Sequence, residues 1–284
     1  MKIDKVLFST SVEFSDFWNI ISRVYKVKMG IEPVCLLFGK KSETNVTEEF
    51  GKVIEMPILP QYNRLLQVTW SKFYFPIFEP DTTWMIGDID MIPLQTKWFT
   101  DNVKEIPDDS YAHLNTGSCC QGSSRDLHDW WYVGGTVDGG CDLPGQYHVA
   151  KGHIFKKALE HTGTFEEELH YIVNSRRYGL GARGSSDPKW HNPEVFYWCA
   201  EEHRSTELIR KNIKNKTIKF YGNIYNTHNN TQRVDRGAYD HNNNDYVYDK
   251  ERLTKNEFVD VHCMRPYKKF ATQTENLLKL ANMI

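Results

Sequence analysis

The sequence predicts an α/β fold, in which helices pack on the faces of a sheet. Two observations carry this prediction. From residue 5 onward, short apolar runs alternate with segments of helical periodicity, a pattern that favours a parallel sheet. The composition, with 40% hydrophobic and 25% charged residues, is that of a globular protein. A chain of 284 residues is long enough for one large domain with its own core.

The first ninety residues supply most of the predicted sheet. Four apolar runs are predicted as strands: 5–11, 32–39, 52–58 and 82–90. Helical spacing of apolar residues marks 17–28 and the segment after Pro60. Ligands of open α/β sheets bind beyond the carboxyl ends of the strands. Asp88 and Asp90 lie at such an end.

The second half is predicted to hold helices and loops around one returning strand. In order, we expect helices at 153–163 and 165–179, a loop leading into a helix over 185–212, a polar surface loop at 226–245, a strand and turn at 257–270, and a last helix from about Thr274. Four glycines between 134 and 140 predict a mobile loop in the Gly-rich stretch 108–150. No repeat and no clean linker divides the chain, so we expect one domain.

The counts of charged residues and cysteines, and the distribution of apolar residues, disfavour several classes of protein. Lys plus Arg (35) nearly balances Asp plus Glu (37), so no basic field recommends nucleic acid as a partner. None of the six cysteines forms a CxxC pair, which argues against structural zinc. The first residues lack the apolar core of a signal peptide, and no run approaches the roughly 20 apolar residues of a membrane span. We therefore expect a cytoplasmic protein without a membrane span.

The acidic pair raises a question of charge. Asp88 and Asp90 stand between apolar neighbours, and a desolvated carboxylate costs several kcal/mol unless a cation compensates it. Two residues apart on a strand, the two side chains would point to the same face and repel. A Mg²⁺ or Mn²⁺ ion would relieve the repulsion and also hold substrate phosphates. Alternatively, Asp88 caps a helix and Asp90 is solvated.

The segment at 85–94, MIGDIDMIPL, resembles the Asp-x-Asp segment of nucleotide-sugar glycosyltransferases of the GT-A fold, and the layout is similar over residues 4–200. The resemblance implies a Rossmann-like mixed sheet flanked by helices. It also implies transfer of a sugar from a nucleotide-diphosphate donor, such as a UDP-sugar, to a glycan or glycoprotein hydroxyl. Mn²⁺ or Mg²⁺ would bridge the diphosphate to Asp90, and Asp88 would contact the ribose or the metal through water. Residues 1–225 would then be the catalytic domain. The length and opening also resemble small GT-A enzymes of algal DNA viruses, which would place the protein in host cytoplasm.

A second resemblance lies downstream, at 261–270. This segment, VHCMRPYKKF, is similar to the His-x-x-Gly-x-x-Lys-Pro-Trp segment of some GT-A enzymes. It implies His262 as a metal ligand, with Arg265, Lys268 and Lys269 near the leaving diphosphate. Residues 226–284 would be an extension that returns to the active site. The Gly is absent and Arg265-Pro266 replaces Lys-Pro, so a strand-end histidine beside a solvated basic turn is the alternative.

The resemblance also suggests where the nucleotide binds. Ser9, Thr10 and Ser11, after Phe8, occupy the place that contacts base and ribose in this fold, and Lys72 corresponds to a basic residue that reaches the donor. A helix N-cap and a surface lysine are the respective alternatives.

An inverting transfer needs a carboxylate to take the acceptor's proton. Glu201 and Glu202 are similar to the acidic element of inverting GT-A enzymes, and 166–168 offers a second group of glutamates. We expect both groups at helix starts, where the dipole favours acids in any case. Glu201 or Glu202 is the preferred base, and no feature excludes a retaining mechanism.

Side chains of the middle segment complete the expected site. Trp130, Trp131 and Trp190 are candidates for an acceptor platform, unless they are core residues. A similar stretch shapes the sugar pocket in GT-A enzymes, which makes pocket candidates of three further residues: Asp142, His148 and Lys151.

Two other functions stay open. A sugar-nucleotide nucleotidyltransferase would need a Gly-rich, basic loop after the first strand, and residues 8–17 contain neither glycine nor a basic residue. A non-catalytic carbohydrate-binding protein would show no metal-dependent affinity for UDP.

Overall fold

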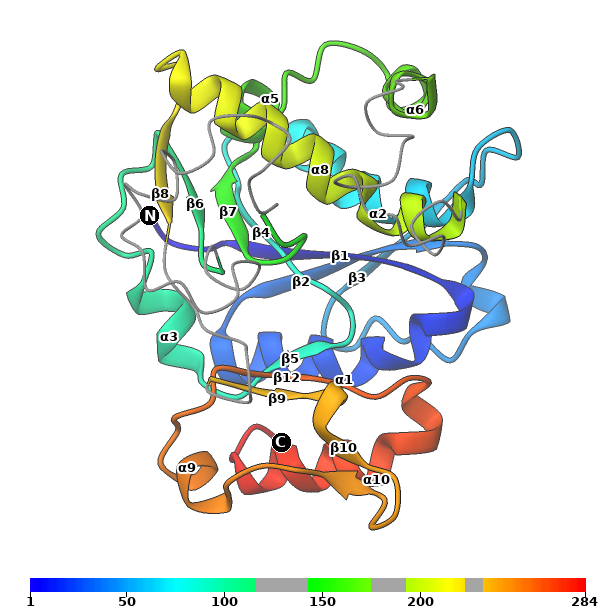
Figure 1. The fold of residues 1–284 in the computed structure, drawn as a ribbon, viewed down its shortest axis with the longest axis vertical. Helices are drawn as coiled ribbons and strands as arrows, with labels where there is room; N and C mark the ends of the chain where they lie inside the picture. The colour runs from blue at the N-terminus through cyan, green and yellow to red at the C-terminus, as the bar shows by residue number, and fades with distance from the viewer. Residues whose placement is uncertain (116–142, 175–192, 223–231) are drawn as a thin grey trace, which may run out of the picture.

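The computed structural model describes residues 1–115, 143–174, 193–222 and 232–284 (Figure 1). The strands are β1 (Lys5–Ser11), β2 (Glu32–Phe38), β3 (Lys52–Met56), β4 (Thr83–Ile86), β5 (Met91–Pro93), β6 (Ser110–His113), β7 (His148–Lys151), β8 (Lys219–Gly222), β9 (Arg233–Asp235), β10 (Tyr239–Asp240), β11 (Asp245–Tyr246) and β12 (Asp260–His262). The α-helices are α1 (Trp18–Arg23), α2 (Arg64–Tyr74), α3 (Thr96–Asp101), α5 (Gly152–Ala158), α6 (Phe165–Asn174), α8 (Pro193–Lys214), α9 (Lys250–Thr254) and α10 (Tyr267–Leu280). Short helical turns are η1 (Val12–Phe17), η2 (Val24–Met29), η3 (Lys41–Glu43), η4 (Phe75–Phe78) and η8 (Arg236–Ala238).

The main sheet has seven strands in the order β3-β2-β1-β4-β7-β6-β8. Its first four strands in this order are parallel. β7 runs antiparallel to both neighbours, and β8 is parallel to β6. The prediction of an α/β fold with a mixed sheet and flanking helices is therefore confirmed.

Each face of the main sheet is covered by its own hydrophobic cluster. Alternate residues of β1 point to opposite faces, so Leu7 packs with α2, α5, α6 and α8. Its neighbours Val6 and Phe8 belong to the cluster on the other face, where the Phe8 ring packs edge-to-face with Trp18 of α1 and Tyr25 of η2. Burial of each such large apolar side chain contributes about 1.5–3 kcal/mol.

A second, three-stranded sheet lies below the main one in Figure 1, in the order β5-β12-β9. β12 runs antiparallel to β5 and parallel to β9. β5 belongs to the chain just after β4, whereas β9 and β12 come from the last quarter of the sequence. The small sheet thus brings the carboxyl-terminal segments to the end of β4.

The first three predicted strands and the helices between them are confirmed, but the fourth strand is shorter than expected. β4 ends at Ile86, so Asp88 and Asp90 lie in the turn that follows it and not on the strand. Gly87 makes the last contact with β1, where its N–H donates to the Leu7 carbonyl at 2.9 Å. A Cβ on Gly87 would overlap the Phe8 ring. Met91 N–H then donates to the Asp88 carbonyl at 3.0 Å, which closes the turn.

Three other expectations are corrected. The polar stretch 226–245 was expected to be a surface loop, but it contains β9. Arg233 of β9 is buried and forms a two-point ion pair with Asp260, at 2.6 and 2.8 Å. The last helix begins at Tyr267 rather than near Thr274. Glu201 and Glu202 lie inside α8, which begins at residue 193, and not at a helix start.

None of the helices in the described ranges is long and apolar enough to cross a membrane.

Candidate active site

Two groups of charged side chains meet at the turn after β4. One, the Asp90 cluster, consists of five residues: Asp90, Asp235, Arg236, His262 and Arg265. The other, the Glu201 cluster, consists of Lys72, Asp88, Glu201 and Glu202 around Gly145. Asp88 and Asp90 therefore belong to different clusters, although they are two residues apart.

The register of the small sheet assembles the Asp90 cluster. His262 pairs with Met91 on one side and with Asp235 on the other. Cys263 N–H donates to the Asp90 carbonyl at 2.8 Å, which fixes the backbone of the turn against β12. Arg236 directly follows β9, so both arginines approach the turn from the carboxyl-terminal segments.

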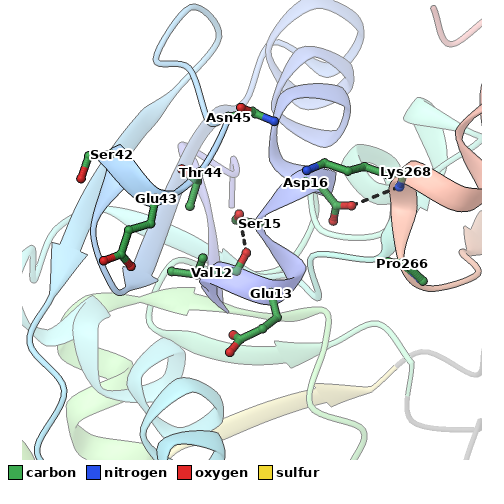
Figure 2. Close-up of a pocket in the computed structure, with 10 residues that line it drawn as sticks. All are labelled: Val12, Glu13, Ser15, Asp16, Ser42, Glu43, Thr44, Asn45, Pro266 and Lys268. Atoms are coloured by element: carbon green, nitrogen blue, oxygen red, sulfur yellow. Dashed lines mark hydrogen bonds between the residues drawn. The ribbon is translucent and has the colours of Figure 1, made fainter.

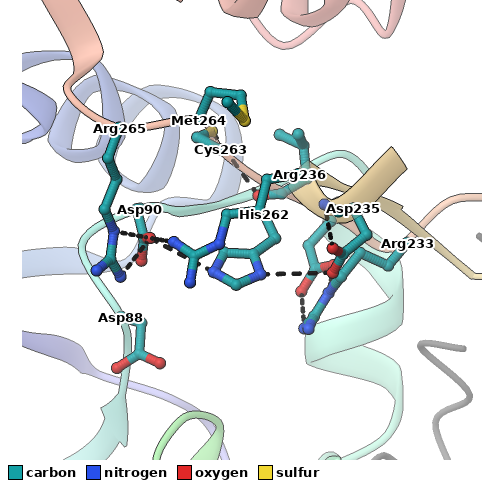
Figure 3. Close-up of polar contacts among 12 residues, drawn as sticks. Asp88, Asp90, Arg233, Asp235, Arg236, His262, Cys263, Met264 and Arg265 are labelled. Atoms are coloured by element: carbon teal, nitrogen blue, oxygen red, sulfur yellow. Dashed lines mark hydrogen bonds and ion pairs between the residues drawn. The ribbon is translucent and has the colours of Figure 1, made fainter. Parts of the chain in front are cut away.

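Three cationic or ionisable groups converge on a single oxygen of Asp90 (Figure 3). Its Oδ2 lies 2.6 Å from both Nε and Nη2 of Arg265. It also lies 3.0 Å from Nη1 of Arg236 and 3.4 Å from Nε2 of His262. The Asp90 side chain is only 2% exposed, so these groups replace the water that a carboxylate needs.

The charges in this cluster hold one another in their ionised forms. Burial alone would raise the pKa of Asp90, but His262 and the two guanidinium groups outweigh it and lower that pKa far below its usual value. Burial also opposes the charge on His262, but its contacts with Asp235 and Asp90 raise its pKa. Against burial, the same imidazole and the Gly237 N–H lower the pKa of Asp235 to about 2.

The Glu201 cluster joins two helices to the turn. Lys72, in the last turn of α2, is buried and forms an ion pair with Asp88. Burial opposes its charge, yet Asp88, Glu201 and Glu202 raise the pKa of Lys72 above its usual value. The prediction of Lys72 near the donor site stays open, but its alternative as a surface lysine is wrong.

Gly145 marks the centre of this cluster. A Cβ built on Gly145 would lie 3.3 Å from Lys72 Nζ, 3.5 Å from Glu201 Oε1 and 3.6 Å from Glu202 Oε1. The Gly145 N–H donates to Glu202 Oε1 at 2.9 Å. The Lys72 ammonium and the carboxyl groups of Glu201 and Glu202 thus surround the Gly145 Cα closely.

Two buried imidazoles hold the segment that carries Gly145. His113 Nε2 and His148 Nε2 lie 3.0 and 2.8 Å from the Pro144 carbonyl, which can only accept, so both nitrogens carry the proton. His148 Nδ1 then accepts from the Tyr111 hydroxyl at 2.9 Å. Burial lowers the pKa of His113 to about 4 and that of His148 well below its usual value, so both rings are neutral.

The two glutamates of α8 differ in environment. Glu201 is buried, and its burial together with the neighbouring Glu202 raises its pKa well above the usual value, which favours its protonated form. Its Oε2 has no hydrogen-bond partner among the described residues. Glu202 is partly exposed and accepts from Gly145, as given above. A protonated carboxyl group cannot act as a base, which distinguishes Glu202 from Glu201.

A cavity of about 450 Å³ lies at the ends of β1 and β2 (Figure 2). Its walls come from the segments that follow β1 and β2, and from Pro266 and Lys268 just after Arg265. Asp16 accepts from the Lys268 backbone N–H at 3.1 Å, and its Oδ1 is buried with no hydrogen-bond partner among the described residues. Asp16 thus lines the cavity and holds the segment that carries Lys268, while its Oδ1 is shielded from solvent.

The remaining predicted residues fall at several places. Ser9, Thr10 and Ser11 are the last residues of β1, and the cavity is lined by the residues that follow them. The Ser9 and Thr10 hydroxyls donate to backbone carbonyls. Lys151 lies at the opposite end of β7 from His148 and pairs with Asp108 at 2.9 Å. Trp130, Trp131, Asp142, Trp190 and the glycine-rich loop lie outside the described residues.

The glutamates at 166–168 do begin a helix, α6, as expected. Glu166 accepts from Gln61 at 2.7 Å, and Glu167 accepts from the Thr164 N–H, also at 2.7 Å. Glu168 lies 2.6 Å from His161 Nδ1 and accepts from Trp70 Nε1 at 2.8 Å. The contact with Trp70 joins α6 to α2. Each of the three glutamates thus has a structural partner.

Arg236 and Asp235 are site residues that the sequence did not reveal. They lie in a polar, Asn-rich stretch that carries no apolar periodicity. Arg236 is 146 positions from Asp90 in the sequence. Only the β-ladder between β9 and β12 brings them to the turn.

No three His, Cys, Asp or Glu side chains within the described ranges form a ready-made metal site. Asp88, Asp90 and His262 as metal ligands stay a prediction. Comparisons of the sequence with models of known protein families and with curated proteins found no match. The function is therefore inferred from the geometry of the two clusters and of the cavity.

Proposed function

We propose that this protein is a glycosyltransferase of the GT-A fold, which moves a sugar from a nucleotide-diphosphate donor, a UDP-sugar, to a hydroxyl group of a glycan or glycoprotein. The observation that carries the proposal is the order of three features along one edge of the main sheet. The cavity lies beyond β1 and β2, the Asp90 cluster lies beyond β4, and the Glu201 cluster lies between that turn and the start of β7. A nucleoside, a diphosphate and a sugar follow one another in the same order in the donor.

The Glu201 cluster suits activation of an acceptor hydroxyl. Glu202 takes the hydroxyl proton as the acceptor oxygen bonds to the anomeric carbon, and the bond from that carbon to the diphosphate breaks with its electron pair on the leaving oxygen. Asp88, Glu201 and Glu202 would together place three negative charges around one point. The Lys72 ammonium and the raised pKa of Glu201 reduce that negative charge. Attack from the face opposite the diphosphate gives inversion.

A divalent ion, Mn²⁺ or Mg²⁺, is part of the proposal. Carboxylate oxygens suit both ions and imidazole suits Mn²⁺, and Asp90 Oδ2 lies 3.4 Å from His262 Nε2. Arg236 and Arg265 contact the same oxygen, so they would have to move aside for the ion. Asp88, Asp90 and His262 would hold the ion. When bound, it supplies positive charge to the leaving diphosphate.

A panel of nucleotide sugars, incubated with the protein and Mn²⁺, tests the proposal. We expect release of the nucleoside diphosphate from at least one UDP-sugar, abolished by Glu202→Gln and retained by Glu166→Gln, a matched loss of an acid from the start of α6. Release of pyrophosphate from UTP and a sugar phosphate would instead indicate a nucleotidyltransferase. Sugar binding without turnover of any nucleotide sugar would indicate a carbohydrate-binding protein.

A further inference from the structure

Tyr147 has a backbone conformation that a tyrosine rarely adopts. Its φ angle is 65°, in the left-handed region, where a bulky side chain costs free energy and glycine is the usual residue. Such a conformation persists only where the surrounding structure holds it, and it is found most often at functional sites. Tyr147 lies between Gly145, whose N–H contacts Glu202, and the start of β7. The strained residue is therefore next to the Glu201 cluster.

Contacts from three directions hold Tyr147. Its N–H donates to the Ile86 carbonyl at the end of β4, at 2.6 Å, and its carbonyl accepts from the Leu114 N–H at 3.0 Å. Its ring is 0% exposed and packs edge-to-face against Phe99 of α3, with the centroids 5.0 Å apart. Its hydroxyl donates to Asp260 Oδ2, in β12, at 2.5 Å. A glycine would relieve the backbone strain but would lose the ring and the hydroxyl, so the side chain is what this position requires.

The hydroxyl contact matters more to Tyr147 than to Asp260. Asp260 also accepts from Nε and Nη2 of Arg233, at 2.6 and 2.8 Å. Loss of the tyrosine hydroxyl would therefore leave this buried carboxylate paired and would leave β12 in place. Tyr147, in contrast, would keep its backbone contacts but lose its link to the small sheet. The small sheet thus serves as a fixed anchor for the segment that carries Tyr147.

That segment also carries the N–H that contacts the proposed base. The Gly145 N–H donates to Glu202 Oε1 at 2.9 Å, and two residues later the φ angle of Tyr147 sets the direction in which the chain enters β7. On the other side of Gly145, the Pro144 carbonyl is held by two buried imidazoles. Gly145 thus lies between two fixed points, and the position of its N–H depends on both.

We propose that Tyr147 is a positioning residue for the transfer: its hydroxyl bond to Asp260 holds the Gly145 N–H against Glu202. This inference rests on the proposed function for the role of Glu202 as the base. The Tyr147 ring is fully buried, so it acts on the reaction through Gly145 and not by contact with the sugar. Asp260 lies in the same strand as His262, so this bond also fixes the base relative to the strand that carries part of the Asp90 cluster.

Steady-state kinetics of Tyr147→Phe, which removes the hydroxyl and keeps the ring, test this inference. With the UDP-sugar that the panel identifies, we expect kcat to fall about tenfold, the effect of one lost hydrogen bond. KM for the donor should change less than about twofold, because the residues proposed to bind the donor keep their contacts. The matched control is Tyr74→Phe, which removes a hydroxyl that donates to the Gly163 carbonyl at 2.9 Å and should leave kcat unchanged. An unchanged kcat in Tyr147→Phe, with or without a lower unfolding temperature, overturns the inference.

Hydrogen exchange tests the positioning without any turnover. In the unaltered protein the Gly145 amide should exchange with deuterium as slowly as the amides of β7, although Gly145 lies outside a strand. In Tyr147→Phe the same amide should exchange at least about tenfold faster, whereas Tyr74→Phe should not change it. Fast exchange at Gly145 in the unaltered protein overturns the inference, and this measurement decides alone if Tyr147→Phe does not fold.

The two proposals fail differently. Protection of the Gly145 amide that depends on the Tyr147 hydroxyl, without turnover of any nucleotide sugar, contradicts the proposed function and leaves the positioning of Gly145 by Tyr147 intact. Turnover of a UDP-sugar with the same kcat in Tyr147→Phe as in the unaltered protein does the reverse.

Discussion

The two clusters on either side of the turn at 87–90 have opposite compositions. In the Glu201 cluster three carboxyl groups surround the ammonium of Lys72, and the pKa of Glu201 is raised. In the Asp90 cluster two carboxylates face two guanidinium groups and an imidazole. A short turn thus separates a cluster rich in acids from a cluster in which cations surround a buried carboxylate.

The largest effect should distinguish the two glutamates of α8. Glu202→Gln should lower kcat by about 10²–10⁴-fold, because it removes the proton acceptor. Glu201→Gln should lower kcat less than about tenfold, because glutamine resembles the protonated acid that the raised pKa of Glu201 favours. Steady-state kinetics on the donor identified by the panel measures both. Equal losses would show that the two residues share one role.

The next effect concerns stability and contrasts the clusters directly. Asp90→Ala should lower the free energy of unfolding by about 3 kcal/mol, because it leaves Arg236 and Arg265 facing each other without their anion. Glu201→Gln should cost less than about 1 kcal/mol, because the raised pKa of Glu201 favours the protonated acid, which glutamine resembles. Urea unfolding measures both variants, with Asp109→Asn, in an exposed pair with Lys219, as a control worth under about 1 kcal/mol. A stable Asp90→Ala protein would mean that solvent already screens these charges.

Smaller effects are expected for the glycines that shape the turn. Gly87→Ala should destabilise the protein by about 1–3 kcal/mol, because its Cβ would overlap the Phe8 ring in the core. Gly145→Ala should cost less, because its Cβ meets only the movable ends of Lys72, Glu201 and Glu202. Thermal unfolding measures the destabilisation by each variant. A larger loss of stability for Gly145→Ala than for Gly87→Ala would show that the Glu201 cluster is more rigid than the core around Phe8.

The smallest effect is a pH dependence of the Asp90 cluster in EDTA. His262 has a raised pKa, so its contribution to stability is complete below about pH 6.5 and is lost as the pH rises through the folded-state value. Asp90 and Asp235 have lowered pKa values, so their contribution is complete above about pH 4 and is lost as the pH falls toward 2. His262→Gln should remove the decline above pH 6.5 and leave the decline in acid. Unfolding curves measured from pH 2 to pH 9 test this prediction. If His262→Gln still lost stability above pH 6.5 as the unaltered protein does, the prediction would be wrong.

Local patterns were sufficient for β1 to β4 of the main sheet, but they did not predict its other three strands, β6, β7 and β8. The strands at 5–11 and 32–39 are apolar runs whose alternate residues enter both cores, and that property is visible in the sequence. The end of β4 was placed too late, because Ile89 and Met91 continue the apolar run through a turn that Gly87 begins. Apolar character alone does not distinguish a buried turn from a strand.

The candidate site was predictable only where a motif was continuous. Asp90, His262 and Arg265 were chosen from short segments, and the structure brings all three together. Their partner Arg236 was not found, because pairing across 146 positions depends on the β9–β12 ladder and leaves no local signal. The cation expected at Asp90 was a metal, whereas the structure also supplies two arginines of the chain itself.

The central position of β12 in the small sheet makes it sensitive to the Asp90 cluster. Asp90 precedes β5 and Arg236 follows β9, and these two strands pair through β12. The ion pair between Asp90 and Arg236 therefore cross-links the two segments that β12 joins. Amide protons of Val261 and His262 should exchange with deuterium faster in Asp90→Ala than in the unaltered protein, so the backbone of β12 reports on the integrity of that ion pair.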